Sequence, residues 1–265
     1  MKWQKSLVGF VTAACISLAS DTAFAGPFTY AVQDLMLCFR KTGGTSDLEV
    51  NLGQASKFYN ATPGSSFTVT NFTAAQLTAA FGSSYANVSW SVAGAMNVAG
   101  DPNAPRNTLW VSAPRTDTAT QSTPWEPRSI TAQGNTVAPV LTVGSGFASA
   151  SGTAASPTTA AVIANGANSY ADNIGSNGDF GQFQGNIENT LASTFVSGGS
   201  VARSDFYQLT PNAANATYLG YFELSQAGAL SFVAVPESGT YAAALGAGLM
   251  AFALFRAHRK SLAHS

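Results

Sequence analysis

Short stretches of alternating apolar and polar residues recur along the middle of the chain, and this period of two is typical of β-strands. Two short turn segments, 43–44 and 225–228, separate consecutive runs, and their Gly and Ser residues predict a hairpin at each place. Strands are predicted at 28–32, 35–39, 48–52, 67–70, 88–92, 108–111, 217–224 and 229–235.

Helical spacing is less common in this chain. Thr73 is placed to cap a helix that ends before Gly82. Pro157 is tolerated in a first helical turn, and Ile187 and Leu191 are spaced as on one helix face. Helices are therefore predicted at 74–81, 156–164 and 183–195, and the proline-rich segment 101–134 is predicted to be an extended loop around one strand.

The segment 26–234 has the length of a single domain with one sizeable core. It is rich in Ser, Thr, Asn and Gly, which favour strands and turns over long helices. We expect a mainly β fold, a β-sandwich-like single domain with a few short helices.

Only 9% of the residues are charged and the net charge is −1. A typical soluble domain carries roughly 25% charged residues. A chain this poor in charge is neither a basic nucleic-acid binder nor a coiled coil, and no bulk charge attracts an anionic membrane. Nucleic acid is therefore not an expected partner.

The N-terminus has the pattern of an export signal. Lys2 and Lys5 precede an apolar stretch, which ends in a small-residue cleavage motif formed by Ala23 and Ala25. We expect residues 1–25 to be a signal peptide, handled by the export machinery, and Gly26 to begin the mature protein.

The C-terminus has the pattern of a short membrane span. No charge lies between Glu237 and Arg256, which leaves 18 residues, or about 27 Å of helix. Tyr241 is placed at one interface, and Arg256, Arg259 and Lys260 mark the cytoplasmic side. We expect a transmembrane helix at about 241–255 and a cytoplasmic end at 261–265.

These C-terminal parts occur in a recognisable order: Val235-Pro236-Glu237, then Thr240-Tyr241, the apolar span and the basic cluster. The segment 235–260 resembles the PEP-CTERM sorting domain of exported proteins from Gram-negative, exopolysaccharide-producing bacteria. The resemblance implies recognition by an exosortase, a membrane-embedded cysteine transpeptidase-like enzyme, and removal of the tail. It also implies an inner-membrane intermediate followed by delivery to the outer surface or extracellular matrix. Ser238 stands where the family has its second proline.

The expected exported body has few residues suited to catalysis. Both histidines, His258 and His264, lie beyond the span, which excludes from the body a Ser-His-Asp triad, a Cys–His pair and zinc bound through histidine. Cys38 lies in an apolar run and is expected to be a buried small hydrophobe. We predict no catalytic residue, no metal site and no cofactor.

Carbohydrate chemistry stays open because glycosidases need only paired carboxylates. Asp47 and Glu49 share one strand face, where we expect a solvated edge. The segment 172–179 is rich in oxygen ligands but departs from the order of a calcium loop, so a turn is expected. Candidate sugar-stacking residues are Trp90, Trp110 and Trp125, and candidate acids near them are Asp101, Asp117 and Glu126.

The sequence therefore predicts a non-enzymatic exported surface or matrix protein, sorted through its C-terminal tail and associated with exopolysaccharide or biofilm. One alternative is a carbohydrate-binding module or glycosidase. Another is a permanently anchored single-pass membrane protein whose tail is never removed, which the departure at Ser238 favours.

Overall fold

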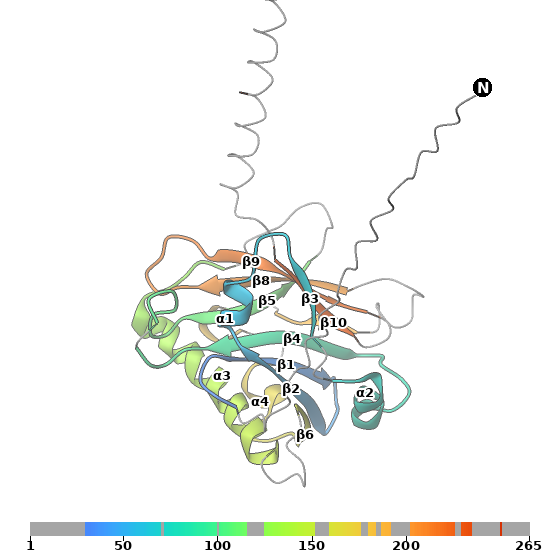
Figure 1. The fold of residues 1–265 in the computed structure, drawn as a ribbon. Coiled ribbons are helices and arrows are strands. Elements are labelled where there is room, and N and C mark those ends of the chain that lie inside the picture. Colours follow the sequence, from blue (N-terminus) through green and yellow to red (C-terminus); the bar gives the residue numbers. More distant parts are fainter. Residues whose placement is uncertain are drawn as a thin grey trace, which may run out of the picture.

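A computed structural model gives the fold of the middle of the chain (Figure 1). The structure describes residues 30–69, 72–99, 101–115, 125–151, 159–175, 180–183, 187–191, 202–225, 229–234 and 250. The expected signal peptide at 1–25 and the residues expected to carry sorting, Val235 to Tyr241 and Arg256 to Lys260, lie outside this part. Within the described residues, none of the helices combines the length and apolarity needed to cross a bilayer.

Ten strands form one antiparallel sheet in the described part of the chain, in the order β3-β10-β9-β8-β5-β4-β1-β2-β6, with β7 paired to β4. The mainly β fold is thus confirmed; the strands join one curled sheet where two separate sheets of a sandwich were expected. The strands are β1 (Asp34–Lys41), β2 (Ser46–Gln54), β3 (Ser66–Val69), β4 (Val88–Ala95), β5 (Leu109–Pro114), β6 (Ala160–Ala164), β7 (Asn189–Thr190), β8 (Ala202–Leu209), β9 (Thr217–Leu224) and β10 (Leu230–Ala234).

One face of the sheet carries a phenylalanine-rich cluster. Phe58, from the short helix α1 (Ser56–Tyr59), lies 5.3 to 6.2 Å from the rings of Phe206, Phe222 and Phe232. The same cluster includes Phe39 and other side chains of β1, β2 and β4, so strands from both halves of the curled sheet share one core. In this way the two halves of a single curled sheet enclose an apolar core, as the two sheets of a sandwich do.

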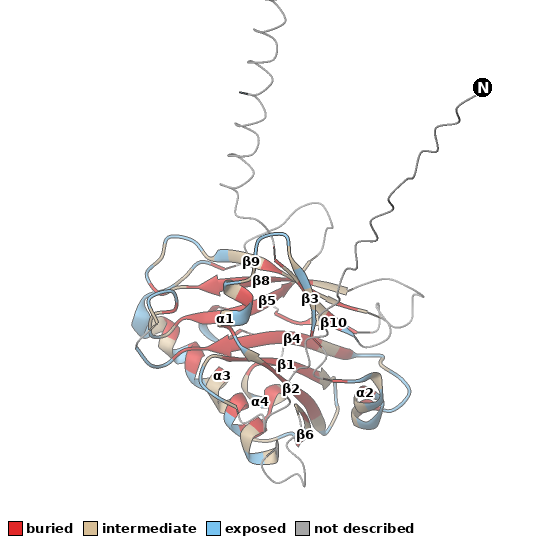
Figure 2. Cartoon of the chain, viewed as in Figure 1, coloured by how far each residue is buried: buried red, intermediate tan, exposed pale blue. Residues whose placement is uncertain are grey.

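The other face carries the α3-side cluster. Helix α3 (Ile130–Ser151) places Val137, Val140 and Phe147 against sheet residues that include Val111 and Leu209. Helix α4 (Tyr170–Asn173) and the 3-10 helix η2 (Gly181–Phe183) complete this layer, while α2 (Ala74–Phe81) packs beside β2. Figure 2 shows the resulting burial along the central strands β5, β4, β1 and β2.

Several predicted elements are confirmed by the structure. The hairpin around 43–44 is β1–β2, and the hairpin around 225–228 is β9–β10. The side chain of Thr73 caps α2 in a reciprocal pair with Gln76, and Gly82 follows the last turn with φ +76°. Strands β3, β4 and β5 also lie where the alternation predicted them.

Other predicted elements are wrong. Residues 160–164 form strand β6 and not part of a helix, because they pair with β2 along their whole length. The predicted helix at 183–195 is contradicted at β7; Ile187 belongs to the α3-side cluster and Leu191 to the phenylalanine-rich cluster, so they share no face. The described residues of 28–32 are not a strand, and the loop predicted to reach residue 134 instead enters α3 at Ile130.

Candidate functional site

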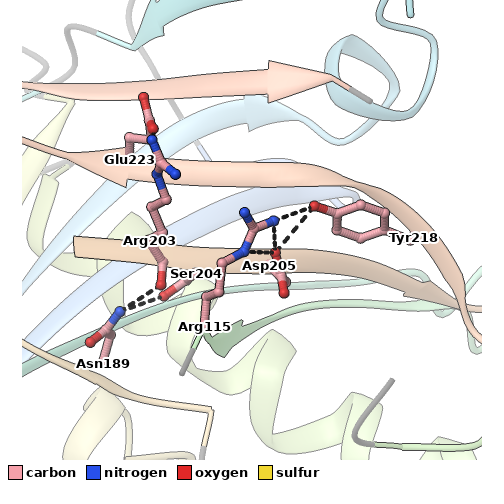
Figure 3. A network of polar contacts seen from close by, with 7 residues as sticks. All are labelled: Arg115, Asn189, Arg203, Ser204, Asp205, Tyr218 and Glu223. Carbon is pink, nitrogen blue, oxygen red and sulfur yellow. Dashed lines mark hydrogen bonds and ion pairs between the residues drawn. The ribbon is translucent and has the colours of Figure 1, made fainter. Parts of the chain in front are cut away.

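A polar surface lies beside the α3-side cluster, on the same face of the sheet (Figure 3). We call it the arginine–tyrosine face; its members are Arg115, Arg203, Asp205, Tyr218, Tyr221 and Glu223. Strand alternation creates it, because Phe206 and Phe222 point into the phenylalanine-rich cluster while their neighbours point the other way.

Arg115 is the more buried arginine of this face. Its Nε donates to Asp205 Oδ1 at 2.8 Å, its Nη2 also bonds that oxygen, and Nη2 donates to the Tyr218 hydroxyl oxygen at 2.6 Å. The Tyr218 hydroxyl in turn donates to Asp205 Oδ1 at 3.2 Å. Burial, followed by the charge of Asp205, raises the pKa of Tyr218, so this phenol stays protonated at physiological pH.

Arg203 is the more exposed arginine. It lies opposite Glu223 across the β8–β9 ladder, and its Nε donates to Glu223 Oε1 at 2.6 Å. The side chains keep 34% and 22% of their surface exposed, against 11% and 4% for Arg115 and Asp205. Tyr221 lies near both guanidinium groups, with its ring centre 4.5 Å from Arg115 Cζ and 5.4 Å from Arg203 Cζ.

Strand β7 holds the edge of this face in place. Asn189 of β7 donates from Nδ2 to the Arg203 carbonyl oxygen at 2.8 Å and to Ser204 Oγ at 3.2 Å. The backbone of Arg115 also bonds the Arg203 carbonyl. The face therefore presents the partly exposed side chains of Arg203, Glu223, Tyr218 and Tyr221 on a fixed sheet, which suits hydrogen bonding and stacking with hydroxyl-rich ligands.

Asp47 and Glu49 are not a solvated edge, and that expectation is corrected by the structure. Both residues are fully buried, beneath the first turn of α4. Asp47 Oδ2 accepts from the Ala171 backbone N–H at 2.7 Å, and Glu49 Oε1 accepts from the Tyr170 N–H at 3.0 Å. Their other oxygens, Asp47 Oδ1 and Glu49 Oε2, have no hydrogen-bond partner.

Burial has a strong effect on these two acids. It raises the pKa of Glu49 to about 8, against the opposing backbone hydrogen bond from Tyr170, and the Asp47 charge adds to the increase. Burial also raises the pKa of Asp47 to about 6, while the Ala171 N–H and Arg40 oppose the change. A pair with separated pKa values resembles an acid–base pair, but neither side chain is accessible to a polymeric substrate.

The remaining polar groups around these acids are paired. Arg40 lies directly opposite Asp47 in the β1–β2 ladder and donates to both Glu188 oxygens, at 2.7 and 2.5 Å. The Tyr170 hydroxyl, which has Ser91 Oγ at 2.6 Å, donates to Glu188 Oε1 at 2.9 Å. This network fixes α4 and the segment before β7 to the sheet.

Cys38 is buried, as expected, and lies opposite Glu49 across the β1–β2 ladder. Burial raises the pKa of its thiol, and the nearby carboxylates add to that shift. A thiol held in its protonated form is a poor nucleophile.

The candidate sugar-stacking tryptophans lie in the core. Trp90 and Trp110 have no exposed surface, and Trp125 keeps 5%. Tyr59 stacks on Trp110 at 6.0 Å, and Trp125 contacts Phe180 at 5.4 Å. Trp125 lines an open pocket of about 300 Å³ with Glu126, Pro127, Arg128 and Phe183, but too little of its ring is exposed to hold a sugar.

Of the other acids singled out from the sequence, the structure describes Asp101 and Glu126. Asp101 accepts from the Tyr59 hydroxyl at 2.6 Å, and this bond lowers the pKa of Asp101. Asp117 lies outside the described residues, as do residues 176–179 of the calcium-like segment. Among the residues that the structure describes, no three His, Cys, Asp or Glu side chains converge as metal ligands.

The arginine–tyrosine face escaped the sequence analysis because strand β8 was not predicted. Strand β8 has the sequence ARSDFYQL. The charged residues Arg203 and Asp205 interrupt the alternation of apolar and polar residues by which the other strands were predicted. The sequence does contain one signal for this strand: Arg203, Asp205 and Tyr207 stand at alternate positions, and Phe206 stands between the last two. A β-strand places the first three side chains on one face and Phe206 on the other.

Comparison with protein-family models, with curated proteins and with solved structures finds no match to this chain.

Proposed function

We propose that this chain is a non-enzymatic exported surface or extracellular-matrix protein that reaches its destination through its C-terminal tail. The observation that carries the proposal is the pair of terminal signals: Ala23 and Ala25 before Gly26, and the ordered elements from Val235 to Lys260. An exosortase-type enzyme acts on the tail, which crosses the inner membrane at about 241–255 until it is removed.

The body contributes by binding exopolysaccharide. The arginine–tyrosine face supports this step, because it offers partly exposed donors and acceptors beside the aromatic ring of Tyr221 on a rigid sheet. The burial of Asp47 and Glu49 disfavours a glycosidase that would use this pair of carboxylates. The permanently anchored alternative shares this binding face and differs only in the fate of the tail.

Deletion of residues 235–265 tests the sorting step. The truncated chain should still be exported but should no longer reach the surface or matrix, because the tail is the element that the sorting enzyme recognises. If fractionation of the cells showed the same final location for the truncated and full-length chains, the tail would have no sorting role.

Arg203→Ala tests the binding step. Arg203 is half-exposed, so its loss should remove binding to the polysaccharide of the producing cells while leaving the fold intact. Arg106→Ala is the matched control, because it removes the same charge from an exposed residue near the opposite end of β5. Equal retention of both variants on that polysaccharide would contradict a role for the arginine–tyrosine face.

A further inference from the structure

Strand β6 is the last strand at one edge of the sheet and pairs with β2 only, within the described residues. The Asn51 N–H donates to the Thr159 carbonyl, and the Asn165 N–H donates to the Thr45 carbonyl. These two bonds show which residues along β6 direct their backbone N–H and C=O groups toward β2. Antiparallel ladders alternate, so the backbone groups of Ala160, Val162 and Ala164 point away from β2.

This edge lacks the features that usually prevent strands from pairing between molecules. Its sequence, Ala160-Ala161-Val162-Ile163-Ala164, has no charge and no proline, and Val162 is 52% exposed. The opposite edge strand, β3, differs: its exposed residues are Ser66 and Thr68, and Lys57 lies over the Phe67 ring at 4.9 Å.

The sequence on both sides of β6 also lacks charged residues. Residues 129–171, which include α3 and β6, contain no Asp, Glu, Lys or Arg. The exposed residues of α3 are all uncharged; Ile130 at its first position is apolar, and the others are Thr131, Asn135, Ala138, Ser145 and Ser149. Two copies of this flank can approach each other without repulsion between like charges.

We propose that β6 pairs antiparallel with β6 of a second copy of this chain, joining two sheets into one across a two-fold axis. With the axis at Val162, each outward N–H and C=O meets its complement: Val162 lies opposite Val162 of the second copy, and Ala160 lies opposite its Ala164. The sequence is close to symmetric about Val162, so this register also places Ala161 opposite Ile163 of the second copy.

A second copy fits this edge better than a charged ligand, because the strand and its flank are apolar or neutral over one continuous stretch of sequence. Helix α3 packs on the face that carries Ala161, and within the described residues β2 is the one strand that pairs with β6. The inference does not depend on sorting or on polysaccharide binding.

Cysteine cross-linking of the full-length chain in mild detergent tests the register. Directly opposite Cα atoms in a hydrogen-bonded antiparallel pair lie about 5.5 Å apart, which is within disulfide range. Val162→Cys should therefore form a disulfide-linked dimer under a mild oxidant. Val98→Cys, at an exposed valine away from the edge, should not, and both variants keep the same native cysteines.

Val162→Lys tests the association itself. It places two like charges opposite each other at the two-fold axis and should raise the dimer dissociation constant roughly tenfold or more. Val98→Lys adds the same charge to a valine of similar exposure and should leave the constant unchanged. A full-length chain that sediments as a monomer, or a Val162→Lys variant that associates as tightly as the native chain, would overturn the proposal.

Discussion

At the scale of single residues, the structure shows which polar side chains are buried and which are exposed, and the sequence alone does not show this. Asp47 and Glu49 look like a solvated pair because they alternate along β2, yet backbone N–H groups more than a hundred residues away cover them. Cys38, by contrast, was predictable as a buried residue, because the apolar run around it is local information. Burial imposed by a distant segment leaves no trace in the neighbouring sequence.

Glu49 predicts a pH dependence of stability. Its pKa is 4.5 in the reference state and about 8 in the folded protein, so between these values the folded chain holds a proton that the unfolded chain releases. The free energy of unfolding should therefore fall as the pH rises through this window, by up to about 1.4 kcal/mol per pH unit. Urea unfolding between about pH 5 and pH 9 measures this slope.

Glu49→Gln tests whether ionisation of Glu49 causes this pH dependence of the free energy of unfolding. It keeps the acceptor for the Tyr170 N–H but cannot ionise, so the slope above about pH 6, where the pKa of Asp47 lies, should flatten. The variant should also be more stable than the native chain near pH 8. An unchanged slope in Glu49→Gln would show that another group titrates in this window.

The two arginines of the arginine–tyrosine face predict unequal costs of truncation. Arg115→Ala leaves Asp205 buried without its charged partner, which should cost about 3–5 kcal/mol of stability. Arg203→Ala breaks a partly exposed cross-strand pair and should cost about 1 kcal/mol or less. Chemical unfolding of both variants checks the ranking, and equal costs would contradict the difference in burial.

At the scale of elements, alternation identified the hairpins and most strands but not α3 or β8. Helix α3 contains Pro139 and several glycines and carries no charge, so it lacks the usual helix signals. Its exposed hydroxyls bond back to the helix, as when Thr142 Oγ1 donates to the Ala138 carbonyl at 3.0 Å. Packing against β6 and η2 stabilises α3, because its local helix propensity alone does not.

The glycines of α3 predict a packing effect. A Cβ added to Gly146 would lie 2.3 Å from the Asn168 carbonyl oxygen, a backbone atom that has little freedom to move. Gly146→Ala should therefore destabilise the fold by roughly 1–3 kcal/mol, despite the better helix propensity of alanine. Gly166→Ala is the control, because a Cβ there meets nothing within 4 Å. Thermal unfolding of both variants should show a lower midpoint for Gly146→Ala alone.

At the scale of the whole molecule, the described residues form a single sheet that curls around one aromatic core and packs α3 on its other face. Composition was enough to predict the mainly β fold. It could not predict the strand order, because β3 crosses to the edge opposite β6 while following β2 in the chain. The two surfaces for which we propose binding arise from that long-range arrangement: the arginine–tyrosine face on β8 and β9, and the uncharged edge at β6.

The chemical ends of the mature protein test export and sorting most directly. Intact mass and C-terminal peptide mapping of the protein recovered from its native cells measure both ends. We predict a form that starts at Gly26 and ends near Pro236. A form that retains Arg256, Arg259 and Lys260 would contradict removal of the tail and would make it a permanent membrane anchor.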